Sequence, residues 1–115
     1  MKKSTEPKLK LTPAPTFHGE VHINAHGNAA PLILKLEFKH KGKKEAIKWI
    51  QSLEEDMRLA SETLLDIVTS IENESGVSAP ATAALFEELM DNYPAPFEDI
   101  IIAWKDYLLK GRKKN

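Results

Sequence analysis

Two stretches of alternating apolar and polar residues constrain the fold of this chain more than any other feature. In residues 17–24, and again in residues 32–39, apolar side chains or glycine occupy every second position. A period of two places one face of a strand in the core and the other face in water. The turn-like segment 25–30 separates the stretches, so we predict an antiparallel hairpin over about residues 17–39. The polar residues expected to face one another across this ladder are Lys35 and Glu37 on one strand and His18, Glu20 and His22 on the other.

Helical spacing replaces the alternation after Gly42. Two strands are marginal in water on their own, so helices must cover the apolar face of the hairpin. Apolar residues that recur every three or four positions predict helices over about residues 43–55, 57–72, 80–93 and 96–110. Residues 64–71 are also rich in β-branched side chains, but their spacing and the length of the segment favour a helix. At the start of the third helix, Ser78 or Thr82 can act as the cap, and Pro80 suits the first turn.

These elements predict an α+β fold in which an N-terminal antiparallel β-hairpin packs on a bundle of about four α-helices, with helix predominating. A chain of 115 residues is long enough for one domain and too short for two. Residues 1–16 contain three prolines and few large apolar groups, which predicts an extended flexible arm. Residues 17–115 would then form the single α+β domain.

The composition excludes several classes of protein. Sixteen basic and 17 acidic residues give a net charge of −1, which disfavours a general binder of nucleic acids or membrane surfaces. No cysteine is present, so disulfides and cysteine-based zinc sites are excluded. No apolar run approaches the ~20 residues of a membrane span, and the charged N-terminus does not resemble a signal peptide. A soluble cytoplasmic protein is expected.

The charges are unevenly distributed along the chain. Basic residues gather near both ends and in a central group, whereas the acidic residues lie mainly between Glu54 and Asp99. The central basic group consists of Lys39, His40, Lys41, Lys43 and Lys44. A neutral protein with this pattern can pack against copies of itself, basic surface to acidic surface. The alternative is that these charges are only solvated tails and helix-end cations.

No residue pattern indicates catalysis or a resident cofactor. His18, His22 and His26 are spaced by four, but on a strand His18 and His22 lie about 13 Å apart, too far to bind one metal ion. Acidic pairs such as Glu54-Glu55 have no nucleophile or apolar pocket near them, and no phosphate-binding, zinc-protease or serine-hydrolase motif occurs. We therefore predict a protein that is not an enzyme, with no catalytic, cofactor-binding or metal-binding residues.

The aromatic residues have two interpretations. Trp49, Trp104 and Tyr107 lie beside basic residues, as in stacking platforms for nucleic acids, but they also fall on or next to apolar stripes. A core role is therefore favoured over nucleic-acid binding. The wide stripes of a short chain also leave apolar surface that either completes a normal core or serves oligomer and partner interfaces.

Several motifs, in their order along the chain, resemble those of phage tail assembly chaperones over about residues 9–115. The motifs are Phe-His-Gly-Glu-Val at 17–21, Leu-Glu-Phe-Lys-His-Lys at 36–41, a leucine-rich segment ending in Asn-Tyr-Pro at 85–94, an aromatic segment at 100–108, and a basic end finishing in Lys-Asn at 111–115. The resemblance implies a protein that binds the tape measure protein, keeps it soluble and helps tail tube subunits polymerise around it. It also implies self-association into a ring or spiral, a longer frameshifted form that engages the tail tube protein, work in the host cytoplasm, and absence from the mature virion.

A chaperone of this kind requires exposed apolar surface and no catalytic pocket. We expect the last two helices to provide the contact surface, and the edge of the hairpin to join neighbouring copies by strand addition. The candidate interface residues are Phe86, Met90, Tyr93, Phe97, Trp104, Tyr107 and Leu108 on the helices, and His18, Val21 and Ile23 on the hairpin. The alternatives are a virion structural protein, such as a head–tail connector, and a small nucleic-acid-binding regulator.

Overall fold

A computed structural model describes residues 14–25, 27, 30–72 and 76–110 of the chain. The predicted arm at 1–16 lies almost wholly outside the described residues, and Thr16 is already the first residue of a strand. The elements in chain order are β1 (Thr16–Ile23), β2 (Leu32–Lys39), α1 (Lys43–Ser52), the 3₁₀ turn η1 (Leu53–Glu55), α2 (Ala60–Thr63), the 3₁₀ turn η2 (Leu64–Asp66), β3 (Val68–Glu72), β4 (Ser78–Pro80), α3 (Ala83–Asn92) and α4 (Pro96–Lys110).

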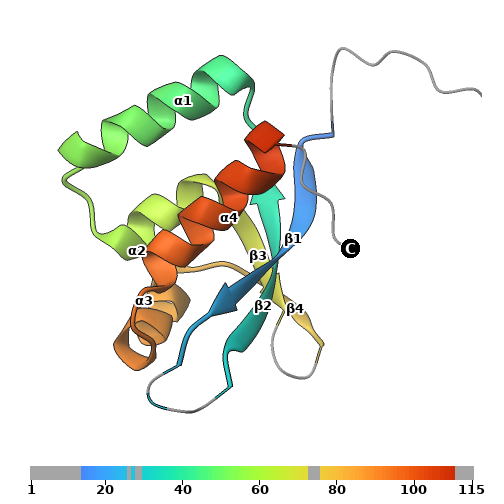
Figure 1. Ribbon diagram of the computed structural model, residues 1–115, viewed down its shortest axis with the longest axis vertical. Helices are drawn as coiled ribbons and strands as arrows, with labels where there is room; N and C mark the ends of the chain where they lie inside the picture. Colours follow the sequence, from blue (N-terminus) through green and yellow to red (C-terminus); the bar gives the residue numbers. More distant parts are fainter. Residues whose placement is uncertain (1–13, 26, 28–29, 73–75, 111–115) are drawn as a thin grey trace, which may run out of the picture.

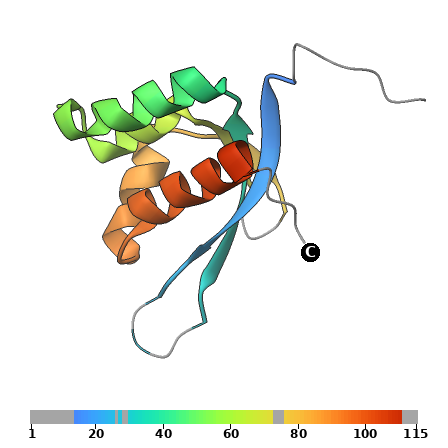
Figure 2. The same ribbon diagram turned by 45° about the horizontal axis from the view of Figure 1, so that its top comes forward.

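The described residues form a four-stranded sheet covered by helices on one side. The strand order is β1-β2-β3-β4, and every neighbouring pair is antiparallel. The helices lie on the same face of this sheet, and α4 crosses it next to β1 (Figures 1 and 2). The predicted α+β class with an N-terminal hairpin is therefore confirmed. The opposite face of the sheet carries no helix of the described chain.

The register of the hairpin follows the alternation of the sequence. His18 pairs with Glu37 and Glu20 pairs with Lys35, as expected from polar residues that share the open face. The apolar positions of both strands point the other way, toward the helices. Two of these positions, Gly19 and Leu36, are directly paired. The two-residue period thus decides which face of the hairpin enters the core.

The predicted helix at 57–72 is wrong. Only α2 and η2 are helical there, and residues 68–72 form β3, which pairs with the second edge of β2. The error arises at a β-bulge, because Glu37 pairs with Ser70 while Phe38 pairs with Val68, which leaves Thr69 as an extra residue. The bulge puts Val68 and Ile71, three residues apart, on the same buried face. Apolar residues three positions apart are also typical of a helix, so their spacing predicted a helix in a segment whose β-branched residues favour a strand.

The third predicted helix begins later than expected. Residues 78–80 form the short edge strand β4, and α3 starts at Ala83. Pro80 lies in this edge strand and not in a helical first turn, a position that tolerates its missing N–H group. Of the two predicted caps, Thr82 is used, since its hydroxyl accepts a hydrogen bond from the N–H of Leu85 at 3.2 Å. The last element, α4, begins at Pro96 and carries Glu98 and Asp99 in its first turn, where the helix dipole favours acidic groups.

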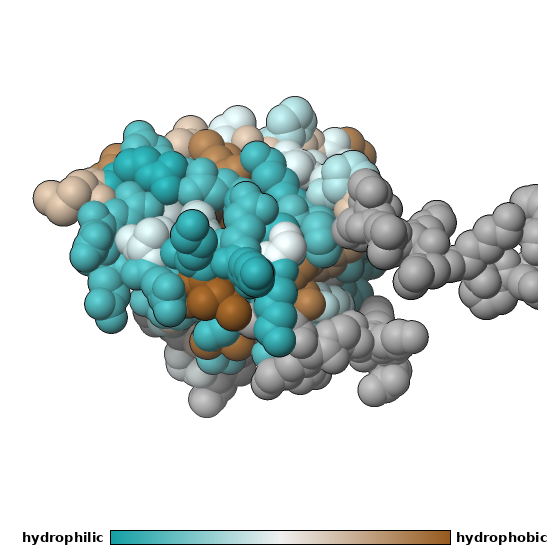
Figure 3. Space-filling view, turned by 90° about the horizontal axis from the view of Figure 1, so that it is seen from above, coloured by the Kyte–Doolittle hydropathy of each residue, from teal (hydrophilic) through white to brown (hydrophobic). Residues whose placement is uncertain are grey.

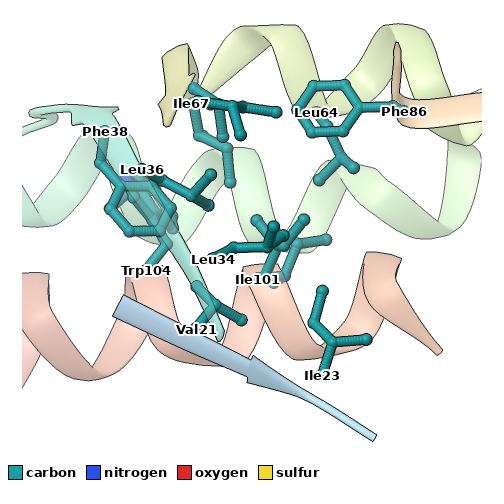
Figure 4. Packing of buried hydrophobic residues seen from close by; sticks show 14 residues of the cluster. Val21, Ile23, Leu34, Leu36, Phe38, Leu64, Ile67, Phe86, Ile101 and Trp104 are labelled. Atoms are coloured by element: carbon teal, nitrogen blue, oxygen red, sulfur yellow. The ribbon is translucent and has the colours of Figure 1, made fainter. Parts of the chain in front are cut away.

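The core lies between the sheet and the helices. Side chains of β1 and β2 point toward those of α4, α3 and η2, as Figure 4 shows for the labelled residues. Trp104 is completely buried at the centre, where its ring packs edge-on against Trp49 at 5.2 Å and its Nε1 donates a hydrogen bond to the carbonyl of Lys39 at 2.9 Å. A second aromatic group joins Phe17, Phe38 and Tyr107, with ring centroids 5.5 to 6.4 Å apart. These contacts fix α4 to the hairpin.

Candidate protein-interaction surfaces

Four of the candidate interface residues belong to the core. Phe86, Trp104, Val21 and Ile23 expose at most 2% of their surface. A side chain with no exposed area cannot touch a partner that docks on the folded chain, so these four positions are corrected from contact residues to packing residues. The apolar face of the sheet, which includes Val21 and Ile23, needs a cover, and α3 and α4 supply part of it with Phe86 and Trp104.

Five other candidates lie at the border between core and surface. Met90, Tyr93, Phe97, Tyr107 and Leu108 pack against the core cluster and keep part of their surface exposed. We define Met90, Tyr93 and Phe97 as the α3–α4 corner, because they lie at the end of α3, at its C-cap and at the start of α4. Half-buried aromatic and methionine side chains are typical of surfaces that bind other proteins.

The β1 edge is partly occupied within the chain itself. β1 pairs on one side with β2 and forms one end of the sheet. His18 is exposed there, as expected for a polar position of the hairpin. The hydroxyl of Tyr107 accepts a hydrogen bond from the backbone N–H of Glu20 at 3.2 Å, so α4 covers the middle of the strand. Addition of a foreign strand along this edge would have to displace that bond.

The structure reveals exposed apolar side chains that sequence reasoning placed in the core. Met57 exposes 95% of its surface and Leu59 exposes 61%, and both lie in the segment between η1 and α2. Both fall within the helix predicted over 57–72, which does not form at these positions. Ile47 on α1 is 38% exposed. Other large apolar residues with exposed surface are Ile33, Val77, Leu85 and Ile102. No sequence signal distinguishes Met57 and Leu59 from core residues when a helix over 57–72 is assumed.

An ion-pair cluster holds the Met57 segment in place. The guanidinium of Arg58 contacts Asp66 at 2.6 Å and Asp56 at 2.9 Å. Asp66 also accepts a hydrogen bond from Nε1 of Trp49, and Asp56 accepts one from the hydroxyl of Thr63. Hydrogen bonds from Arg58 lower the pKa of both carboxyl groups, and the two carboxylates, Asp66 first, raise the pKa of Arg58. Because the side chain of Arg58 is tied to the body of the protein, its neighbours along the chain are presented to solvent in a defined position.

A second polar cluster lies around Glu37 on β2. Its carboxylate accepts hydrogen bonds from the hydroxyls of Thr16 at 2.7 Å, Thr69 at 3.0 Å and Ser70 at 3.2 Å. These bonds, Thr16 first, lower the pKa of Glu37, and the facing His18 contributes in the same direction. One carboxylate thus joins β1, β2 and β3. The bulge leaves Thr69 without a paired residue in the β2–β3 register, and its hydroxyl instead donates a hydrogen bond to the carboxylate of Glu37.

The Glu37 cluster predicts a measurable part of the acid sensitivity of the fold. A folded-state pKa below the ordinary value contributes stability that is present above pH ~4.5 and is lost as the pH falls further. Glu37→Gln should therefore lose less stability than the wild type when the pH is lowered from about 6 to about 3. At neutral pH the variant should be destabilised by no more than about 1 kcal/mol, because the group is largely screened by solvent. Urea unfolding followed by circular dichroism at a series of pH values measures both effects.

Three other carboxyl groups also change the pH dependence of stability. Asp56 and Asp66 have lowered pKa values in the fold, so the variant should keep part of the acid sensitivity. Burial and the neighbouring Glu98 raise the pKa of Asp99, which acts in the opposite direction and favours the folded state as the pH falls. Identical pH profiles for the variant and the wild type would contradict the role given to Glu37.

Clustered metal ligands and membrane-spanning helices are not seen in the described part of the chain. Within residues 14–25, 27, 30–72 and 76–110, no three or more histidine, aspartate or glutamate side chains gather as metal ligands would. His18 and His22 are exposed on the open face of the sheet, and His26 lies outside the described residues. None of the helices in these ranges has the length and apolar character needed to cross a membrane.

The described surface carries half-buried and exposed apolar groups, as surfaces that bind other proteins often do. The chain belongs to the phage tail assembly chaperone family, whose model matches residues 5–115, essentially its whole length. No curated protein and no solved structure matches the chain. The resemblance inferred from the motifs at 17–41 and 85–115 is therefore confirmed at the level of the family.

Proposed function

We propose that this protein binds the tape measure protein of a long-tailed phage, keeps it soluble, and promotes tail tube polymerisation around it as an oligomer. The observation that carries the proposal is the family match over residues 5–115. The exposed and half-buried apolar side chains of the described surface support it, because a chaperone for a long apolar rod must offer such groups outside its core. A family of chaperones also gives no reason to expect catalysis.

The remaining parts of the proposal concern partners and location. We propose that the tail tube protein is engaged through a longer form of the chain made by ribosomal frameshifting. The protein would act in the host cytoplasm and leave the tail before the virion matures. Mass spectrometry of purified particles tests this last point, since finding the chain at a fixed copy number would favour a structural role such as a head–tail connector.

Co-expression with the tape measure protein tests the central part of the proposal. The soluble fraction of the tape measure protein should rise when the chain is present, and the two proteins should copurify. Met90→Ala combined with Tyr93→Ala should weaken binding of the tape measure protein by about tenfold. The reason is that a few aromatic or apolar residues contribute most of the binding energy of a protein interface, so their removal lowers the affinity strongly. Circular dichroism of the variant verifies that the α3–α4 corner still folds.

Ile33→Ser provides the matched control. Ile33 is 51% exposed, but it lies on β2 on the open face of the sheet, away from the helices. The control should solubilise the tape measure protein as well as the wild type does. A tape measure protein that stays equally insoluble with and without the wild-type chain would contradict the proposed function.

A further inference from the structure

Most of the charges at the two ends of α1 are arranged against the helix dipole. A helix favours acidic groups near its first turn and basic groups near its last turn. α1 begins with Lys43 and Lys44, beside one acidic residue, Glu45; it has no basic residue in its last turn, and Glu54 and Glu55 follow in η1. Its N-cap, Gly42, forms no side-chain cap. Residues that destabilise their own helix are expected at functional sites, such as surfaces that bind another molecule.

Each end of this helix also carries exposed apolar surface. We define the basic end as Lys43, Lys44 and Lys48 with Ile47, which lie on the exposed face of α1. We define the acidic end as Glu54, Glu55 and Glu62 with Met57 and Leu59, all of them exposed. Figure 1 shows α1 as a rod along one side of the molecule, so its first turn and the segment that follows its last turn lie at opposite ends of the rod. Figure 3, which views that side, shows a mostly hydrophilic surface interrupted by small separate hydrophobic areas.

Charges of opposite sign near each end are already neutralised within the chain. At the basic end, the carboxylate of Glu45 lies 3.7 Å from Nζ of Lys41. At the acidic end, Arg58 is bound between Asp56 and Asp66. The remaining charges are therefore lysines at one end and glutamates at the other. A ten-residue helix is about 15 Å long, which exceeds the Debye length of about 8 Å at physiological salt, so Lys43 and Lys44 at its start are not neutralised by Glu54 and Glu55 after its end.

We propose that the basic end of α1 in one copy of this chain docks on the acidic end of the next copy, with Ile47 packing near Met57 and Leu59. The two surfaces are complementary in charge, and each surrounds an apolar centre with charged groups, as protein interfaces commonly do. Because the contact joins different patches, it leaves a free basic end and a free acidic end on every pair. It therefore generates an open chain or a closed ring of copies. The inference rests on the oligomeric state in the proposed function and names the surface that produces it.

Paired charge reversals test this contact. Lys43→Glu with Lys44→Glu gives a chain with two acidic ends, and Glu54→Lys with Glu55→Lys gives a chain with two basic ends. Each variant alone should associate at least about tenfold more weakly than the wild type in sedimentation velocity runs, because like charges then meet. An equimolar mixture of the two variants should recover association, since every basic end finds an acidic end. Wild-type association should also weaken between about 50 mM and about 500 mM salt.

Stability measurements separate this result from misfolding. Both reversals place charges where the helix dipole favours them, so the melting temperature of each variant should be unchanged or higher while its association falls. The matched control reverses Glu88 and Asp91 to lysine, two exposed acidic residues on α3, and should associate as the wild type does. Met57→Ser should weaken association without changing the melting temperature, because this side chain is almost fully exposed.

The outcomes also distinguish the contact from the function. The α1 contact is wrong if the wild type associates but neither reversal weakens association. It is also wrong if the mixture of the two variants does not recover association. Neither result contradicts the proposal that the protein acts as an oligomeric chaperone. A wild-type chain that stays monomeric at every concentration and salt would overturn the contact and the oligomeric state together. The co-expression assay with the tape measure protein would then decide whether the chaperone activity remains.

Discussion

Replacement of Trp104 by alanine should lower the free energy of unfolding by about 3–5 kcal/mol, the range observed when a large buried aromatic ring is removed. Trp104 has no exposed surface, packs against Trp49 and donates a hydrogen bond to the carbonyl of Lys39. Its removal opens a cavity between α4, α1 and the end of β2. A domain of this size has a total stability of roughly 5–15 kcal/mol, so the variant should be largely destabilised. Urea unfolding monitored by circular dichroism measures the loss.

Two further variants show which interaction of Trp104 matters. Trp104→Phe keeps most of the ring but leaves the carbonyl of Lys39 without its donor, so it should cost less, about 1–3 kcal/mol. Ile102→Ala, on the same helix but 54% exposed, should change stability by no more than about 0.5 kcal/mol. If Trp104→Ala kept the wild-type stability and lost only partner binding, the residue would be a contact residue, and the burial assigned to it would be wrong.

Gly19→Ala should destabilise the protein by about 1–3 kcal/mol, although alanine is normally the better residue in a strand. A Cβ atom at Gly19 would lie 2.8 Å from a ring carbon of Tyr107 and 3.0 Å from a ring carbon of Phe38. Phe38 is completely buried and cannot move aside, and Tyr107 is held by its hydrogen bond from the N–H of Glu20. The absence of a side chain at Gly19 is what allows α4 to approach β1 so closely.

A double-mutant cycle tests that explanation directly. Tyr107→Ala removes the ring that the new methyl group would meet, so Gly19→Ala should cost at least about 1 kcal/mol less in that background. Gly42→Ser is the matched control, because nothing lies within 4 Å of a Cβ atom at Gly42 and serine is a favourable N-cap. This control should leave stability unchanged or slightly raised. Additive effects of the Gly19 and Tyr107 substitutions would show that the two residues are not in contact.

The candidate surfaces were only partly predictable from the chain. Half-buried candidates such as Tyr93 and Phe97 were found because aromatic residues on helical stripes mark either core or interface. The choice between these two roles depends on which neighbours arrive from elsewhere in the sequence. Phe86 and Trp104 meet side chains of the sheet and are buried, whereas Met57 meets none and is exposed.

By itself, the sequence determined those features that depend on residues close together in the chain. Alternation determined the hairpin and its buried face, and the spacing of apolar residues determined α4. For the start of α3 the sequence offered two caps, Ser78 and Thr82, and the structure uses Thr82. Only the tertiary structure decided that residues 68–72 form a strand, because the open edge of β2 supplies backbone partners that a local pattern does not contain. Spacing by three in that strand is the product of a bulge against Glu37 and Phe38, and a bulge exists only once two strands are paired. Burial follows the same rule, since it is a property of contacts between distant residues and not of any residue alone.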